Sequence, residues 1–236
     1  MTKNLRAELL IVLTLTFGIS GVRAVLRLIN SLAAPQPLNE QSVTLNSSQS
    51  ALAWVDLGLQ LCSAAVLFAY GALVIFLLAQ DHIKPAAYRA FDWLHGAGLA
   101  ALIGIPGLVL YFAAVQFGWS KEVIPGDFDN AWLEIPVSLI KAAANAFAEE
   151  TVVVMWLMTR LRQARWSLPA ALAASSILRG SYHLYQGVSA GFGNIIMGVI
   201  YGYYYHRTGR VWPLVIAHFL IDAIAFLGYS FGLSVL

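Results

Sequence analysis

Long apolar runs separated by short polar connections dominate the chain. A helix needs about 20 apolar residues to cross the hydrocarbon core of a bilayer. Seven stretches approach or exceed this length, and each predicts a transmembrane helix. Their approximate ranges are 7–29, 52–79, 95–118, 132–159, 169–187, 190–206 and 211–232. The pattern therefore predicts an all-α fold, a polytopic membrane helix bundle of about seven transmembrane helices, in one transmembrane domain over 1–236.

The basic residues of the connections alternate along the chain. Nine Lys and Arg residues lie in the N-terminal segment and in connections 80–94, 160–168 and 207–210, whereas the other three connections contain only Lys121. Cytoplasmic connections of membrane proteins carry an excess of Lys and Arg. We therefore predict a cytoplasmic N-terminus, and the alternation independently supports seven spans.

The composition excludes an ordinary soluble domain. Hydrophobic residues make up 59% of the chain and charged residues 11%, whereas soluble domains contain about 25% charged residues. The first apolar run resembles a signal peptide. However, it is followed by Arg23 and Arg27, and no small-residue cleavage pattern lies close behind it, so we interpret it as a retained helix. The single cysteine, Cys62, lies in an apolar segment, which favours a packed thiol.

Two features predict contacts between helices. Asn194, Gly198 and Gly202 recur at a spacing of four, and small residues at this spacing allow two helix backbones to approach closely. Arg23 and Arg27 lie near the outer end of the first span, and Asp56 lies near the outer start of the second. Because adjacent helices would place these groups at similar depth, we predict that one of the arginines pairs with Asp56.

Three of the predicted spans carry ionisable or polar side chains deep in the bilayer. The residues are Lys141, Asn145, Glu149 and Glu150 in 132–159, Arg179 and His183 in 169–187, and His218 and Asp222 in 211–232. At about 1.5 Å per residue, the acids, the histidines and Arg179 fall roughly 10–21 Å from the cytoplasmic ends of their helices. An ionised group at mid-bilayer costs about 2.5–3.5 kcal/mol. Matched depth on three helices therefore predicts one shared site that is reached by water and lined by five residues, Glu149, Glu150, His183, His218 and Asp222. Arg179 and Asn145 are predicted to support it.

The residue types favour hydrolysis. A carboxylate beside an imidazole can hold and deprotonate a water molecule, and donors on a facing helix can stabilise the oxyanion formed when water attacks a carbonyl. Ser181 lacks an obvious Ser–His–acid order. We expect no cofactor. A zinc ion is the alternative, because Glu and His side chains can bind zinc, but the sequence contains no HExxH motif. A polar network that only holds the bundle together is the structural alternative.

These residues resemble the motifs of the CPBP family of intramembrane proteases, which includes the Ras-converting CAAX prenyl endopeptidases and bacterial Abi-type immunity proteins. The family pattern is a Glu-Glu pair followed by Arg, then Phe-x-x-x-His, then His-x-x-x-Asn/Asp, on three helices. Here Glu149-Glu150 follows Asn145, and RGSYH ends at His183. The third motif, HFLID, runs from His218 to Asp222. The resemblance covers about 132–232, which we interpret as the catalytic core of the domain.

The resemblance implies a role for each residue. Glu149 and His183 would activate the attacking water with help from Glu150, and His218 and Asp222 would serve the oxyanion. An ionised Asp222 would repel an oxyanion, so it must be protonated or act by orienting His218.

Two positions depart from the family pattern. Val154 stands where the family has Arg, and Arg179 stands where the family has Phe. The two changes look compensatory, because a cation is lost from one helix and gained at the same depth on its neighbour. We therefore predict that Arg179 lies within salt-bridge distance of Glu149 or Glu150. The competing hypothesis is a diverged member that has lost activity.

The functional prediction is an endopeptidase that cleaves a membrane-associated protein or peptide. It would be an integral membrane protein, expected in a bacterial plasma membrane, with the lipid bilayer as its surroundings and no nucleic acid as a partner. The first alternative is a non-catalytic immunity or scaffold protein that binds another membrane protein through the same bundle. The second is a proton-coupled carrier, since acid and histidine chains also form proton relays.

Overall fold

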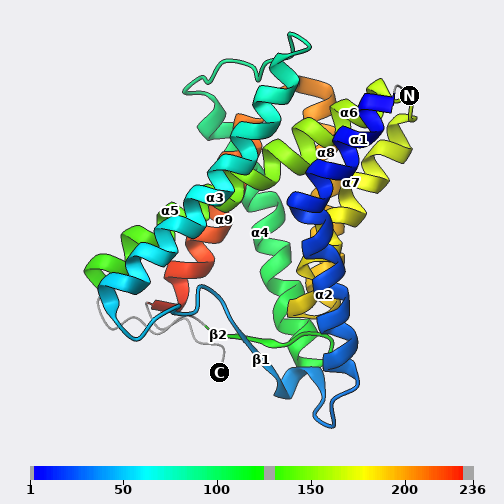
Figure 1. The fold of residues 1–236 in the computed structure, drawn as a ribbon. Coiled ribbons are helices and arrows are strands. Elements are labelled where there is room, and N and C mark those ends of the chain that lie inside the picture. Colours follow the sequence, from blue (N-terminus) through cyan, green and yellow to red (C-terminus); the bar gives the residue numbers. More distant parts are fainter. Residues whose placement is uncertain (1–2, 125–130, 231–236) are drawn as a thin grey trace.

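The computed structural model describes residues 3–124 and 131–230, and most of them are helical (Figure 1). The α-helices are α1 (Lys3–Leu15), α2 (Phe17–Leu32), α3 (Ala53–Ala79), α4 (Asp92–Gln116), α5 (Ala131–Glu149), α6 (Leu157–Gln163), α7 (Leu168–His183), α8 (Val188–Thr208) and α9 (Trp212–Ser230). The shorter elements are the 3₁₀ turns η1 (Leu38–Glu40) and η3 (Leu184–Gln186), the π-helix η2 (Glu150–Trp156), and strands β1 (Ser42–Thr44) and β2 (Glu122–Ile124). The all-α prediction is therefore confirmed apart from one pair of three-residue strands.

The apolar surface is that of a membrane helix bundle. Within the described residues, α3 and α4 are long and apolar enough to cross a bilayer, and α1 with α2 adds a third span if the bent pair counts as one. Large apolar side chains such as Phe76 on α3 and Ile105 and Val109 on α4 are exposed. Cys62 is also exposed on α3, so the prediction of a packed thiol is wrong. Because the outer surface of α3 is apolar, a thiol needs no packing partner there.

The predicted first span is two helices, not one. The axes of α1 and α2 meet at 49°, and the break falls at Thr16, whose hydroxyl donates to the carbonyl oxygen of Val12 at 2.6 Å. This back-bond competes with regular helical geometry. The bend carries α2 onto α7, where the backbone of Gly21 lies against the side chain of Ser181.

The predicted ion pair between α2 and α3 is wrong. Asp56 instead accepts hydrogen bonds from the Ser48 hydroxyl at 3.1 Å and from the backbone N–H of Gln49. The bend at Thr16 is the physical reason, because it directs α2 away from the start of α3. Figure 1 shows these two segments on opposite sides of the bundle.

The connections gather at two ends of the bundle. At one end, β1 pairs in parallel with β2, and Ser120 forms an antiparallel bridge with Gly187, so connections 33–52, 117–124 and the start of α8 lie together. At the other end, Arg160 pairs with Glu8 at 2.7 Å and also with Asp81. The connections rich in Lys and Arg thus lie at one end of the bundle and the connections poor in them at the other, as the alternation along the sequence predicts. Which end faces the cytoplasm stays a prediction.

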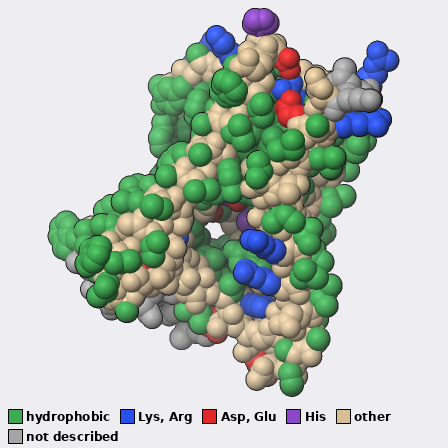
Figure 2. Space-filling view, in the orientation of Figure 1, with side chains coloured by type: hydrophobic (Ala, Val, Ile, Leu, Met, Phe, Trp, Pro, Cys, Tyr) green, Lys and Arg blue, Asp and Glu red, His purple; other side chains and the backbone are tan. Residues whose placement is uncertain are grey.

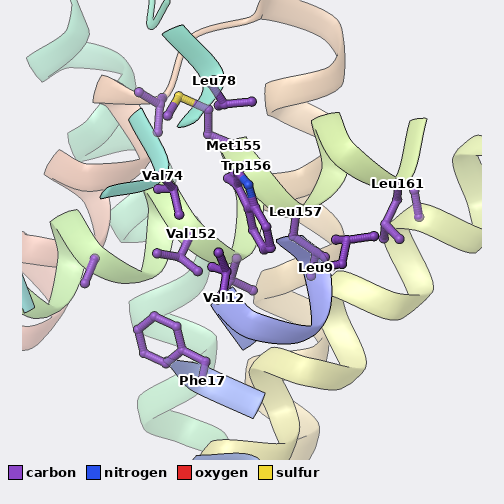
Figure 3. Close-up of a cluster of buried hydrophobic side chains, with 14 of the residues drawn as sticks. Leu9, Val12, Phe17, Val74, Leu78, Val152, Met155, Trp156, Leu157 and Leu161 are labelled. Atoms are coloured by element: carbon purple, nitrogen blue, oxygen red, sulfur yellow. The ribbon is translucent and has the colours of Figure 1, made fainter. Parts of the chain in front are cut away.

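A buried apolar cluster fixes η2 between α1 and α3. Figure 3 shows Trp156 and Val152 of η2 among Val12 of α1 and Val74 and Leu78 of α3, and these five side chains are at most 2% exposed. The indole N–H of Trp156 donates to Glu8 at 2.8 Å, which satisfies its polar atom. Because η2 follows Glu149 directly, this cluster holds the acidic pair in place.

Small residues bring α7 and α8 into close contact, as the spacing in the sequence predicts. A Cβ atom on Gly198 would lie 2.8 Å from the Cα of Ser176, and one on Gly180 would lie 2.6 Å from the carbonyl oxygen of Gly191. Real Cβ atoms do not approach other atoms so closely. This contact fixes the position of Arg179, which lies between Ser176 and Gly180 on α7.

We expect Gly198→Ala to lower the free energy of unfolding by about 1–3 kcal/mol, because the added methyl group overpacks the α7–α8 contact. Gly98→Ala is the matched control, since a Cβ on Gly98 of α4 meets no atom within 4 Å. The control should be neutral or slightly stabilising, because alanine favours a helix over glycine by about 1 kcal/mol. Thermal unfolding of both variants in the same detergent tests this, and equal midpoints would contradict it.

Candidate active site

The acidic pair lies where one long helix changes its hydrogen-bonding pattern. The chain runs without a break from α5 through η2 into α6, and Glu149 and Glu150 flank the start of the π-helical segment. The β-branched run Thr151, Val152, Val153 and Val154 follows the pair, and such residues disfavour regular α-helix. Widened π-turns occur frequently at functional sites. Here the turn is buried on all sides, so both carboxyl groups point into the bundle.

Glu150 is completely buried and binds two partners through one oxygen. Its Oε1 lies 2.7 Å from Nη2 of Arg179 and 2.7 Å from Nδ1 of His218. An ionised carboxylate only accepts hydrogen bonds, so both partners donate to it. Glu150 thereby links α7 to α9 through a charged contact. Such a contact is strong, because little water competes for it.

Glu149 faces the other side of the same turn. Its Oε2 accepts a hydrogen bond from the Tyr182 hydroxyl at 2.7 Å. The same oxygen lies 3.6 Å from Nη1 of Arg179 and 3.7 Å from Nε2 of His183. The distance to His183 is too long for a direct hydrogen bond. It does allow one water molecule to contact both atoms at ordinary lengths of about 2.8 Å.

The third motif places His218 between two carboxyl groups. Its Nδ1 donates to Glu150, and its Nε2 lies 3.6 Å from Oδ1 of Asp222, four residues further along α9. Asp222 is near enough to orient the imidazole ring. The i, i+4 spacing therefore places both side chains on the face of α9 that meets η2.

Arg179 occupies the centre of the cluster. Its side chain is fully buried, and its guanidinium lies 5.6 Å from the centre of the Tyr201 ring on α8. Its contact with Glu150 confirms the predicted salt bridge. Val154, at the position of the family's arginine, is buried in an apolar cluster with Met158 and Leu214. A cation thus reaches the acidic pair from α7 rather than from η2.

Three other polar residues lie outside this network. Lys141 donates to Gln60 on α3 at 2.6 Å, and Ser181 donates to the carbonyl oxygen of Leu178 at 2.7 Å. Asn145 lies one turn before Glu149 on α5 and is partly exposed, and it forms no hydrogen bond to another part of residues 3–124 and 131–230. The supporting role of Asn145 stays a prediction.

Water reaches one edge of the cluster rather than all of it. The side chains of His183 and Asp222 are 18% and 21% exposed, whereas Glu150 and His218 lie behind them. Figure 2 shows a hollow through the middle of the molecule with acidic and histidine side chains at its upper rim. The prediction was a water-reached cavity lined by Glu149, Glu150, His183, His218 and Asp222. In the structure, His183 and Asp222 form an accessible edge, and the other three side chains form a buried network behind it.

Two further observations concern ligands and nearby groups. Among the described residues, no group of three His, Cys, Asp or Glu side chains is arranged to hold a metal ion. The side-chain Nε2 of His183 is buried and without a hydrogen-bond partner in the described part of the chain. This atom faces Glu149, so the pair offers a place for a small polar ligand such as water.

Sequence reasoning missed Tyr182 and Tyr201. Both tyrosines lie in helices that are apolar overall, where an aromatic residue usually signals packing. Tyr182 was detectable in principle, because it lies three residues after Arg179 and so shares its helix face. Tyr201 had no such signal, since only the tertiary contact of α8 with α7 brings it to Arg179.

Comparison with known proteins agrees with the motifs. Residues 131–224 match the family described as type II CAAX prenyl endopeptidase Rce1-like. No curated protein and no solved structure matches the chain. The matched region begins with α5 and contains the acidic pair, Arg179, both histidines and Asp222. The match covers the part of the chain that builds the site, and there it supports the CPBP/CAAX protease family.

Proposed function

We propose that this protein is an intramembrane endopeptidase that hydrolyses a peptide bond of a membrane-associated protein or peptide. The observation that carries the proposal is the pair formed by Glu149 and His183. Their facing atoms lie 3.7 Å apart, just behind the accessible edge that the His183 side chain helps to form. A water molecule held by both would contact a base and a second proton-transfer group.

Glu149 would act as the general base. The hydrogen bond from Tyr182 and the nearby guanidinium of Arg179 orient its carboxylate toward His183. As water attacks the scissile carbonyl, Glu149 takes the proton of the water. His183 would help hold the water and pass the proton taken by Glu149 on to the leaving amine, so that the peptide bond breaks into a carboxylate and an amine and Glu149 is restored.

Glu150, Arg179 and His218 would form the support of the site. Glu150 holds the His218 ring through Nδ1, which leaves Nε2 directed toward Asp222 and the accessible edge. A protonated His218 can donate to the oxyanion from Nε2. Asp222 would orient the ring and balance its charge, which removes the need for Asp222 itself to contact the oxyanion.

The surrounding topology in this proposal is the one that the sequence predicts. One domain over 1–236 would cross the membrane seven times with its N-terminus in the cytoplasm, and the site would lie within the bilayer. The two groups of connections at opposite ends of the bundle support this arrangement. A bacterial plasma membrane is the proposed location.

The direct test uses purified protein in lipid nanodiscs and a pool of apolar peptides. The proposal expects new peptide termini, detected by mass spectrometry, that His183→Gln does not generate. Peptides that are retained without being cut would instead favour a binding or scaffold protein. A proton-coupled carrier would neither cut nor retain them.

We expect the activity to be unchanged by metal chelators such as EDTA and 1,10-phenanthroline. Oε1 of Glu150 already has two donors at 2.7 Å, Arg179 and His218. A metal ion would have to enter beside a guanidinium, and the two cations would repel each other. Peptidase assays with and without chelator test this, and a loss restored by added zinc would contradict a metal-free mechanism.

A further inference from the structure

Helix α2 has a basic sector that the proposed catalytic chemistry does not use. At 100° per residue, Arg23, Arg27 and Asn30 fall within an arc of about 60°. All three are exposed. Buried positions such as Ala24 form the side that packs on the bundle, and exposed apolar positions such as Ile29 form another. The basic sector borders exposed apolar positions of α2, among them Leu26.

Part of this sector lines a pocket of about 390 Å³. Arg27 and Asn30 of α2 contribute one wall, and Lys121 and Tyr185 contribute to the others. The backbone N–H of Lys121 donates to the carbonyl oxygen of Gln186 at 2.9 Å, which fixes the connection before β2 against η3. The volume lies in the range of small-ligand sites.

The cations of the pocket lack carboxylate partners in the described residues. None of Arg23, Arg27 and Lys121 forms an ion pair within residues 3–124 and 131–230. Burial and the nearby charge of Arg27 lower the pKa of Lys121, so the two cations share one electrostatic environment. Like charges held together favour an anionic ligand, because it offsets their repulsion.

The pocket adjoins the candidate active site. Tyr185 lines the pocket with Arg27 and follows His183 of the candidate active site by two residues. Figure 2 shows Lys and Arg side chains along the α2 side of the hollow, below the histidine and acidic side chains at its rim. A chain that lies in the hollow can therefore reach both sites.

We propose that Arg27 and Lys121 bind a carboxylate of the peptide substrate and so select substrates that carry an acidic group beside the cleavage point. The carboxylate would come from an Asp or Glu side chain or from a free chain end. A lipid headgroup would supply a similar anionic group, and the test below separates it from a peptide carboxylate. The proposal rests on the peptidase function proposed above and names its substrate class.

The test measures peptide binding, so that it does not depend on catalysis. Full-length Glu149→Gln protein in zwitterionic nanodiscs is titrated with a labelled apolar nonapeptide amide containing one Glu, and with its Gln counterpart. A third probe is the Gln peptide with a free C-terminal carboxylate. We expect at least one carboxylate probe to bind about tenfold more tightly than the neutral amide, the size of one charge-assisted hydrogen bond. The two carboxylate probes distinguish a side-chain from a terminal source.

Adding Arg27→Gln and Lys121→Gln to this protein should abolish the preference. The matched control is Lys84→Gln with Arg207→Gln, which removes two exposed cations from the opposite end of the bundle and should keep it. Equal binding of all probes, or equal loss in the control, would overturn the proposal. Phosphatidylglycerol in the nanodisc provides one more contradicting outcome. The proposal fails if this lipid protects Lys121 from acylation, and so occupies the pocket, while binding of the neutral peptide is unchanged. If the protein prefers carboxylate peptides but never cuts a peptide, the proposed carboxylate site stands and only the peptidase function is refuted.

Discussion

Arg179→Ala is expected to lower the free energy of unfolding by about 3–5 kcal/mol, because it leaves the buried Glu150 carboxylate without its cation. Arg179 is fully buried and lies 2.7 Å from Glu150. Arg179→Phe restores the family's residue type and should be equally damaging, since a phenyl ring supplies no charge. Thermal unfolding in detergent, with peptidase activity measured on the same preparations, tests both variants.

The double variant Arg179→Phe with Val154→Arg should recover part of the loss, because the cation returns to the acidic pair from η2. The control is Arg160→Ala with Val154→Arg. Arg160 is a buried cation paired with Glu8 and Asp81 at the end of the bundle, so its loss should not be rescued from position 154. If the Arg179 double variant is no better than the worse single variant, Arg179 does not replace the family's arginine. The hypothesis of an inactive, diverged member would then gain support.

Glu149→Gln is expected to reduce peptidase activity by about 10²–10⁴-fold, the usual contribution of a general base, while the protein stays folded. The amide keeps an oxygen that can accept the hydrogen bond from Tyr182, and Arg179 keeps its contact with Glu150. Stability should therefore change far less than in Arg179→Ala. Turnover of a cleaved peptide and the unfolding midpoint are measured together.

Glu122→Gln on β2 is the control for this variant, because it removes the charge of an exposed glutamate distant in sequence from the acidic pair. It should change neither quantity. Activity retained in Glu149→Gln would contradict the role of Glu149 as base. If Glu149→Gln mainly lowers the unfolding midpoint, the result would favour the alternative hypothesis that the polar network only holds the bundle together.

The helices could be predicted from sequence because a bilayer imposes length and apolarity directly. The predicted ranges 190–206 and 211–232 correspond closely to α8 and α9. The break at Thr16 was not predictable in this way, because hydropathy stays high across it. A local hydrogen bond from the Thr16 hydroxyl to Val12 accompanies it. The wrong pairing of Asp56 followed from assuming that spans adjacent in sequence are adjacent in space.

The charged part of the candidate site was predictable for a related reason. Burial of Glu150 or Arg179 in an apolar setting is costly without a partner, so their presence at matched depth required a contact. The contribution of Tyr182 was harder to foresee, since a tyrosine in a membrane helix needs no charged partner. Nothing in the sequence indicated that Arg27 and Lys121, separated by two predicted spans, line one pocket.

The most direct test of the proposed peptidase compares the peptides present in native membranes that contain wild-type protein with those in membranes that contain Glu149→Gln at equal abundance. Quantitative mass spectrometry of peptide termini is the measurement. If Glu149 activates water for peptide hydrolysis, a defined set of termini will occur with the wild type and be absent with the variant. Identical sets of termini, with both proteins folded and equally abundant, would contradict the proposed function.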